Sequence, residues 1–331
     1  WGQWFGNSNS HPMFHFPIDL VHLNRNRAVS YSGNENQLFD PPVAPPVYPR
    51  TSTSGRFNDL FAAGRFTSAC SAIVFRAPSL RVSNRETAFI CEPVHNLVHR
   101  AILKPDGASF VATRAEQEQD REFLASTDAW FRPTRVITGP DGALWIVDMY
   151  RETIEHPEWI PEAWQQQLDL RAGQDRGRIY RVLAGSDGED DRWKSLSDRP
   201  TDELVELLTS TNGTLRDMAQ RLIIHRNDDG ATERLIAFAS NVRSPHAAVH
   251  AVSILATRNR LTPQILADTL RSDHPGVLIA SIPHCEGFLA EHPTLLRSLE
   301  RLAIHHDPGV VLHVALAAGT SSDAAAGELL A

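Results

Sequence analysis

Residues suited to acid–base and cofactor chemistry surround two turn motifs in the first half of the chain. The tripeptide Pro-Asp-Gly occurs at 105–107 and again at 140–142. Proline fixes φ, aspartate bonds its own backbone and glycine accepts positive φ, so each copy predicts a tight reversal between two strands. Polar residues at the far ends of those strands should then share one edge. They are Arg65, Glu92, His95, Arg132, Arg135, Asp148, Tyr150 and Arg151.

This set of residue types predicts a site for an anionic cofactor or a sugar. Histidine abstracts hydroxyl protons, which makes His95 the candidate catalytic base. Arginine forms paired hydrogen bonds with carboxylates, so the candidate cofactor-binding residues are Arg65, Arg132, Arg135, Tyr150 and Arg151. Carboxylates orient a histidine or bind Ca²⁺, which makes Glu92 and Asp148 the candidate metal ligands.

A structural interpretation of the same residues stays open beside the functional one. Arg132 and Arg151 can pair with Asp148 or Glu152 and so only lock strands together. His95 and His99 lie four apart in a strand-rich segment, where they share a face without forming a helical metal pair. Either histidine can be a hydrogen-bonded core residue.

Composition limits the class of protein. The chain has 331 residues, enough for two domains, and its net charge of −8 argues against nucleic acid or an anionic membrane as the main partner. No run approaches the roughly 18 apolar residues of a membrane helix. Cys70, Cys91 and Cys285 form no CxxC. Cys70 and Cys91 form either one disulfide, if they lie on neighbouring strands, or two buried thiols.

The first half is punctuated by Pro, Gly, Asn and Asp between short β-rich runs. Many short strands with frequent turns are typical of an all-β sandwich, barrel or propeller. The predicted strands are 72–76, 87–91, 96–103, 109–113, 135–138, 144–148 and 178–182.

The second half changes to a helical period after an acidic linker at 184–193. Similar nine-residue segments begin at Thr214, His246, Pro275 and Pro308. The distance in sequence between their starts is about the length of two helices with their turns. Such spacing predicts a HEAT-like solenoid over residues 194–331. Asp273, in Asp273-His-Pro, and Asp307, in Asp307-Pro, are expected to cap two of its helices, with proline in the first turn.

Several longer strings in residues 1–183 resemble one known family. Together they look like the PVC-type haem-binding CxxCH proteins, which are membrane-bound dehydrogenase-like proteins. The strings are Trp1-Gly-Gln-Trp-Phe-Gly-Asn-Ser-Asn-Ser10, Ala63-Gly-Arg-Phe-Thr-Ser-Ala-Cys70, Cys91-Glu-Pro-Val-His-Asn-Leu-Val-His-Arg100, Glu122-Phe-Leu-Ala-Ser-Thr-Asp128, Phe131-Arg-Pro-Thr-Arg-Val-Ile-Thr-Gly-Pro-Asp-Gly142 and Ile154-Glu-His-Pro-Glu-Trp-Ile-Pro161.

The resemblance implies a multidomain protein, an all-β partial β-propeller over 1–183 followed by an all-α HEAT-like solenoid. It also implies an extracytoplasmic location, periplasmic or at the cell envelope, and a c-type cytochrome domain that would carry haem c. No Cys-x-x-Cys-His occurs in this sequence, and the early blades are absent. The chain is therefore expected to be a fragment whose haem domain lies elsewhere.

Two functions follow as expectations. The leading one is a quinoprotein-like dehydrogenase that oxidises a sugar or small alcohol with pyrroloquinoline quinone and Ca²⁺, then passes electrons to the cytochrome domain. The alternative is a non-catalytic scaffold that binds carbohydrate, or a partner protein through the helical repeats. The two are distinguished by whether the full-length protein binds pyrroloquinoline quinone with Ca²⁺ and reduces an artificial electron acceptor.

Overall fold

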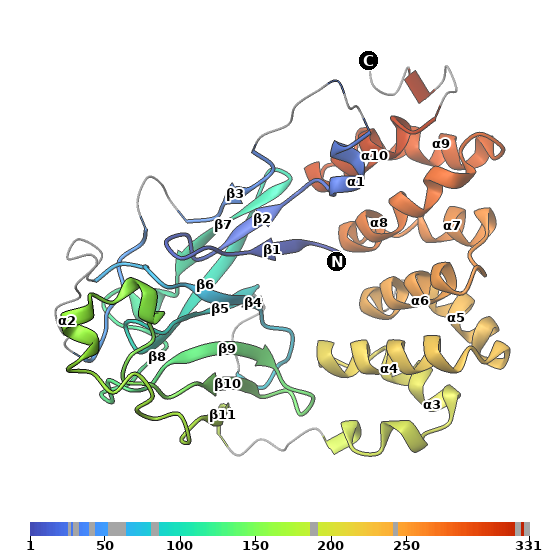
Figure 1. Ribbon diagram of the computed structural model, residues 1–331. Helices are drawn as coiled ribbons and strands as arrows, with labels where there is room; N and C mark the ends of the chain where they lie inside the picture. The colour runs from blue at the N-terminus through green and yellow to red at the C-terminus, as the bar shows by residue number, and fades with distance from the viewer. Residues whose placement is uncertain are drawn as a thin grey trace. The chain divides into compact units, whose positions relative to one another are not determined.

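The chain folds into two compact units, one β-rich and one helical. The computed structural model describes residues 1–25, 28, 33–39, 44–51, 64–80, 86–185, 191–240, 244–321 and 326–327. Residues 4–19 and 26–189 form the β-rich unit, whereas residues 1–3, 20–25 and 190–331 form the helical unit. Figure 1 labels the elements of both units.

The described part of the β-rich unit holds three antiparallel sheets. Their strand orders are β1-β2-β3, β4-β5-β6-β7 with β8 also paired to β6, and β11-β10-β9. The strands are β1 Trp4–Gly6, β2 Phe14–Phe16, β3 Asn36–Gln37, β4 Cys70–Val74, β5 Thr87–Glu92, β6 Leu97–Asp106, β7 Ser109–Arg114, β8 Leu124–Ala125, β9 Pro133–Thr138, β10 Leu144–Asp148 and β11 Arg178–Val182. A short helix α2, Glu162–Gln165, lies between β10 and β11.

This arrangement corrects the predicted partial propeller followed by a solenoid. The sheets contain three, five and three strands, and none of them is closed or propeller-like; a helical region follows. The reason lies in β6, which is ten residues long. Its first half pairs with β5 and with β8, and its second half pairs with β5 and β7. A strand that branches in this way does not build the regular four-stranded blade that a propeller repeats.

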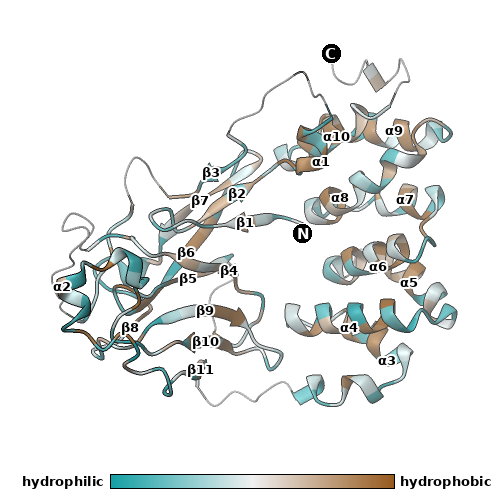
Figure 2. Cartoon of the chain, in the orientation of Figure 1, coloured by the Kyte–Doolittle hydropathy of each residue, from teal (hydrophilic) through white to brown (hydrophobic). Residues whose placement is uncertain are grey.

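The β5–β6 hairpin forms the centre of the β-rich unit. Every residue of β5 is buried, and so are Leu97, Val98 and Ala101 of β6. One face packs on Met13, Leu38 and Phe66, and the other face packs on β9 and β10. Figure 2 shows the apolar residues of β9 and β10 in brown. A strand that is buried on both faces reads as a continuous apolar run, which is why alternation is weak in Thr87–Glu92.

The helical unit contains two rows of packed helices. In one row α4, α6, α8 and α10 contact one another in turn, and in the other α5, α7 and α9 do so. No described helix is both long and apolar enough to cross a bilayer. The helices are α1 Leu20–Leu23, α3 Thr201–Leu207, α4 Gly213–Arg226, α5 Thr232–Ala239, α6 Pro245–Thr257, α7 Pro263–Thr269, α8 Pro275–Ser281, α9 Pro293–Leu302 and α10 Pro308–Ala318.

Helix caps in this unit follow the sequence pattern with one exception. The Asp307 carboxylate accepts hydrogen bonds from the N–H groups of Gly309 and Val310, as expected. Before α8, however, the cap is His274, whose ring nitrogen accepts from the N–H of Gly276 at 3.1 Å. The predicted cap, Asp273, is one residue too early. Proline occupies the first turn of both helices, where its missing N–H costs no hydrogen bond.

The two Pro-Asp-Gly motifs form turns of unequal importance. Asp106 is exposed. Asp141 is buried, and its Oδ1 accepts from the Ala143 N–H at 3.1 Å and from the Trp145 indole at 2.9 Å. Its Oδ2 accepts from the guanidinium of Arg181 on β11 at 2.8 Å. Asp141 therefore ties the turn between β9 and β10 to β10 and β11, although the sequence gives both motifs the same letters.

We predict that Asp141→Ala lowers the free energy of unfolding by about 2 kcal/mol, because it leaves the buried N–H of Ala143 and the partly buried indole N–H of Trp145 without their acceptor. The matched change Asp106→Ala should cost less than about 0.5 kcal/mol, as expected for an exposed turn residue. Urea unfolding of both variants measures the difference. Equal losses in the two variants would contradict the role given to Asp141.

Candidate functional site

Glu92 and His95 form a buried pair between β5 and β6. Glu92 is fully buried, and its Oε2 accepts from the N–H groups of Thr67 and Ser68 at 3.1 and 2.8 Å. The other oxygen lies 3.4 Å from Nδ1 of His95. Nε2 of His95 accepts from the N–H of Gly64 at 3.1 Å. This bond fixes the proton on Nδ1, so the lone pair that a general base needs is already occupied.

Arg132 lies next to this pair and donates hydrogen bonds to four backbone carbonyls. Its Nη1 donates to the carbonyls of Pro93 and Val94 at 3.0 and 3.3 Å, directly before His95. Its Nε and Nη2 donate to the carbonyls of Arg151 and Glu152 at 2.9 and 2.7 Å. The guanidinium thus bonds to main-chain oxygens, including the carbonyl of Glu152. Arg132 ties the β5–β6 turn to the segment after β10.

Asp148 ends β10 and holds the backbone on both sides of it. Its Oδ1 accepts from the N–H of Arg132 at 2.8 Å and from the N–H of Tyr150 at 2.9 Å. Its Oδ2 is buried without a hydrogen bond and lies 3.8 Å from Nε of Arg178. Tyr150 adopts a φ of +53°, a strained value for a side chain of its size. The bond from Asp148 holds that strained residue in place.

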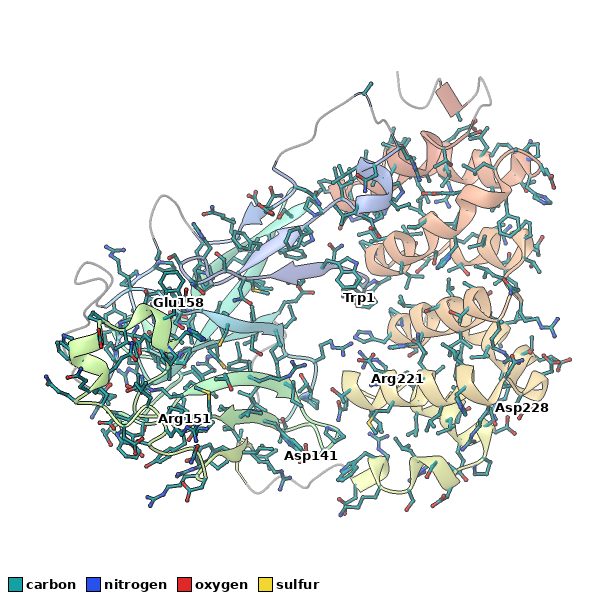
Figure 3. All side chains as sticks on the ribbon, in the orientation of Figure 1. Trp1, Asp141, Arg151, Glu158, Arg221 and Asp228 are labelled. Carbon is teal, nitrogen blue, oxygen red and sulfur yellow. The ribbon has the colours of Figure 1, made fainter. Side chains whose placement is uncertain are left out.

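The side chains of Tyr150 and Arg151 contact groups next to the end of β10. The guanidinium of Arg178 lies 3.9 Å from the centre of the Tyr150 ring, a cation–π contact. Arg151, labelled in Figure 3, donates to the carbonyls of Met149 and Tyr150 at 3.2 and 3.1 Å. Both residues thus support the strand end that Asp148 closes.

The two remaining candidates lie at the surface. The guanidinium of Arg65 donates to the carbonyl of Ala44 at 2.8 Å, and its side chain is exposed. Arg135 is exposed on β9, where its backbone is paired with Val147. Neither guanidinium is hydrogen-bonded to the buried pair. The described part of the chain contains no group of three or more His, Cys, Asp or Glu placed to hold a metal ion.

A second buried network surrounds His99 and was not predicted from the sequence. Nδ1 of His99 lies 2.7 Å from Oε2 of Glu122, and Arg114 donates to Oε1 of Glu122 at 2.7 Å. The N–H of Tyr48 donates to the same oxygen at 3.0 Å. The ring of Phe66 meets His99 edge-on at 5.4 Å. Because these partners lie 23, 8 and 74 positions from Glu122, no short motif indicates them.

The pKa of Glu122 reflects this network. Burial of the carboxyl raises the pKa, but the hydrogen bonds and charges of His99 and Arg114 outweigh it and bring the pKa below its ordinary value of 4.5. Glu122 therefore stays ionised inside the unit, where its charge pairs with the Arg114 guanidinium and its Oε2 lies 2.7 Å from Nδ1 of His99.

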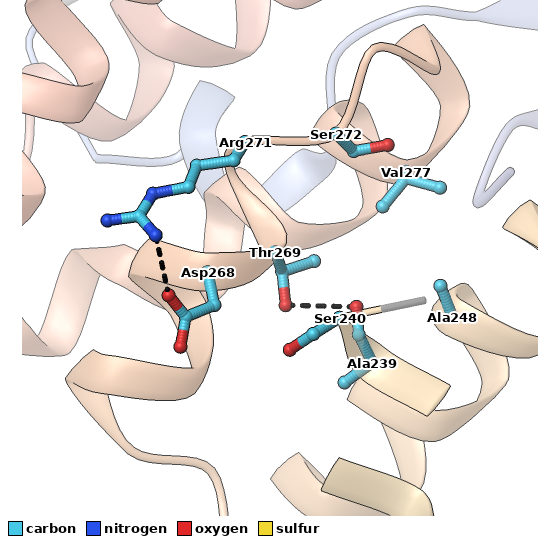
Figure 4. A pocket seen from close by; sticks show the side chains of 8 residues that line it. All are labelled: Ala239, Ser240, Ala248, Asp268, Thr269, Arg271, Ser272 and Val277. Carbon is cyan, nitrogen blue, oxygen red and sulfur yellow. Dashed lines mark hydrogen bonds and ion pairs between the residues drawn. The ribbon is translucent and has the colours of Figure 1, made fainter. Parts of the chain in front are cut away.

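The helical unit contains a small cavity of about 270 Å³ (Figure 4). Three of its polar side chains have partners within the helical unit. Asp268 pairs with Arg271 at 3.2 Å, and the hydroxyl of Thr269 donates to the carbonyls of Ile265 and Ala239 at 2.8 and 3.3 Å. No candidate residue from the sequence lines it. The lining residues are Ala239, Ser240, Ala248, Asp268, Thr269, Arg271, Ser272 and Val277.

Together, the fold and the polar networks define a two-unit protein whose buried charges hold strands and loops in place. Residues 1–186 match a family described as a domain of unknown function, DUF7133. Because the match covers more than half of the chain, the protein belongs to that family. No curated protein and no solved structure matches the chain.

We predict that Glu122→Gln lowers the free energy of unfolding by about 3 kcal/mol at neutral pH, since it leaves the largely buried Arg114 guanidinium without its charge partner. The pKa of Glu122 is lowered in the folded state, so its contribution is complete above about pH 4.5 and is lost as pH falls through the folded-state pKa.

The difference between wild type and Glu122→Gln should therefore shrink on acidification, which urea unfolding at pH 7 and at about pH 3 measures. The matched control is Glu116→Gln. Glu116 is exposed and precedes Glu122 in the chain, so its substitution should have little effect on stability at either pH. A difference that does not change with pH would contradict the ionised state of Glu122.

Proposed function

We propose that this chain is a non-catalytic protein-interaction module. The observation that carries the proposal is that the groups needed for chemistry are already bonded inside the fold. Both ring nitrogens of His95 have partners, and Arg132 donates to four main-chain carbonyls. A catalytic base and a cofactor-binding arginine would need those same atoms.

The exposed edge strand β11 supports the same function. β11 is the last strand of its sheet and pairs with β10 on one side. Ile179 and Tyr180 expose 61% and 40% of their surface, which is unusual for large apolar residues in a strand. Such an edge can add an extended segment of another protein by backbone pairing. The guanidinium-bearing side chains of Arg178 and Arg181 are 40% and 38% exposed, which favours an acidic segment.

The rival function is the quinone-dependent dehydrogenase. It requires that the chain hold pyrroloquinoline quinone with Ca²⁺ near Glu92, His95, Arg132 and Asp148, and that a c-type haem domain accept the electrons. Binding would have to break the bonds that Glu92 and Arg132 now make with the backbone. Oδ2 of Asp148 accepts no hydrogen bond, but it lies 3.8 Å from Nε of Arg178, and a cation bound there would compete with that arginine.

We therefore predict no saturable binding of pyrroloquinoline quinone in the presence of Ca²⁺, measured by quenching of tryptophan fluorescence. We also predict no reduction of an artificial electron acceptor with a panel of sugars and small alcohols. Saturable binding that His95→Gln or Arg132→Lys abolishes, with the circular dichroism spectrum unchanged, would support the dehydrogenase instead.

The interaction function predicts binding of an extended acidic probe along β11. The probe is a synthetic peptide of alternating valine and glutamate, and the measurement is fluorescence anisotropy. Ile179→Asn should weaken binding at least about tenfold, because the variant loses roughly 1.4 kcal/mol or more of apolar contact. The same peptide methylated on alternate backbone nitrogens should not bind, since it has lost the donors that pair with the strand.

Ile304→Asn provides the matched control, because Ile304 is 90% exposed in the helical unit. That variant should bind the peptide like the wild type. Equal binding by wild type and Ile179→Asn would refute the docking edge. Concentration-dependent dimers that the peptide does not dissociate would indicate that a second copy of the chain, and not a partner, pairs with β11.

A further inference from the structure

Cys70 and Cys91 lie opposite each other on two neighbouring strands. They are direct partners in the antiparallel ladder of β4 and β5. Opposite residues in such a ladder have Cα atoms roughly 4.5–5.5 Å apart, within the range of about 4.4–6.8 Å that disulfides span. The two thiols also influence each other's pKa, which agrees with their direct pairing in the ladder. Both cysteines are free thiols in this structure.

The surroundings of the pair suit a disulfide better than two separate thiols. Cys91 is fully buried among Phe75, Phe89 and Val98, and Cys70 packs against the same cluster. A disulfide is apolar and needs no hydrogen-bond partner in such a core. The Sγ of Cys70 also contacts the carbonyls of Thr134 and Pro133 on β9, at 3.5 and 3.8 Å.

The neighbouring bulge connects this pair to a second sheet. The register between β4 and β5 shifts after Cys70, and Ser71 adopts a φ of +53°. The Ser71 hydroxyl donates to the carbonyl of Val136 at 3.3 Å and accepts from its N–H at 3.0 Å. Ser71 thereby joins β4 to β9 across two sheets. A covalent bond at Cys70 would fix one side of this strained bulge.

We propose that Cys70 and Cys91 form a reversible cross-strand disulfide, which locks β4 to β5 beside the Ser71 bulge. The oxidant is a small-molecule disulfide such as oxidised glutathione. The Cys70 thiolate attacks one sulfur of the oxidant and releases one reduced glutathione. Cys91 then loses its proton and attacks the Cys70 sulfur of the mixed disulfide, which releases the second. Two protein thiols are oxidised and one glutathione disulfide is reduced to two thiols.

The ionisation of the two thiols agrees with this order of attack. A hydrogen bond from Cys91 lowers the pKa of Cys70, whereas burial raises the pKa of Cys91 well above its ordinary value. Cys70 is also the more accessible of the two. Cys285 differs from both, because it is buried in the helical unit and burial raises its pKa to about 12.

In the test, the folded chain is equilibrated with oxidised or reduced glutathione. It is then unfolded in the presence of N-ethylmaleimide, which labels free thiols, and its mass is measured. After oxidation we expect a single maleimide, on Cys285, and a peptide map that links Cys70 to Cys91. After reduction we expect three maleimides. Three maleimides under both conditions, or a link that includes Cys285, would overturn the proposal.

Two variants distinguish the chemistry from a loss of folding. Cys91→Ser should hold glutathione on Cys70, because the resolving thiol is gone, while Cys285→Ser should form the bond like the wild type. A third readout is urea unfolding of the wild type. Closing a loop of about 20 residues should lower the unfolded population of the oxidised form about hundredfold or more at equal urea. An unchanged midpoint would also count against a bond that fits the native geometry.

Discussion

The β-rich unit depends on keeping its buried carboxylates paired, and four of them show how this is done. Burying a charge without partners is costly, so each carboxylate must find donors inside the fold. Glu92 takes two backbone N–H groups of the segment before β4, and Asp148 takes two at the end of β10. Glu122 and Asp141 take arginines from other strands. The four together connect loops to strands that the backbone ladders alone do not join.

This constraint explains why residues suited to catalysis are structural in this unit. An arginine that donates to four carbonyls is held in one geometry and gains little freedom to follow a ligand. A histidine between a carboxylate and a backbone N–H is likewise fixed in one tautomer. The types of residue that would bind a quinone are therefore the types that hold irregular loops, and only the bonding pattern distinguishes the two uses.

Local features of the fold were predictable, and those that depend on distant partners were not. The strand runs from residue 87 to 113 and from 135 to 148 follow from turn chemistry and apolar pattern, and the structure has strands there. The cap of α10 by Asp307 follows from an Asp-Pro pair. The pairing of strands into sheets is different, because it includes partners that are not neighbours in the chain. β8 pairs with β6 although β7 lies between them in the sequence. The sequence therefore indicated hairpins correctly and a propeller wrongly.

The candidate site shows the same division. The turn argument placed Glu92, His95, Arg132 and Asp148 at neighbouring strand ends, and hydrogen bonds of Arg132 do connect the two ends. It could not indicate that these bonds go to carbonyl oxygens, because main-chain acceptors carry no sequence signal. The Glu122 network was missed for a related reason: Tyr48, His99 and Arg114 meet it only after three separate segments have folded together.

The boundary of the family differs from the boundary of the folded units. The family match ends at residue 186, but Trp1–Gln3 and Leu20–Arg25 pack within the helical unit. The ring of Trp1, labelled in Figure 3, lies 4.5 Å from the rings of His246 and of His274. Nε2 of His22 and the guanidinium of Arg25 each lie 2.8 Å from the carboxylate of Glu286. Residues inside the match thus complete the core and surface of helices outside it. A chain cut at 186 would leave the side chains of Trp1, His22 and Arg25 without these partners. The matched residues therefore include short segments that belong to the helical unit.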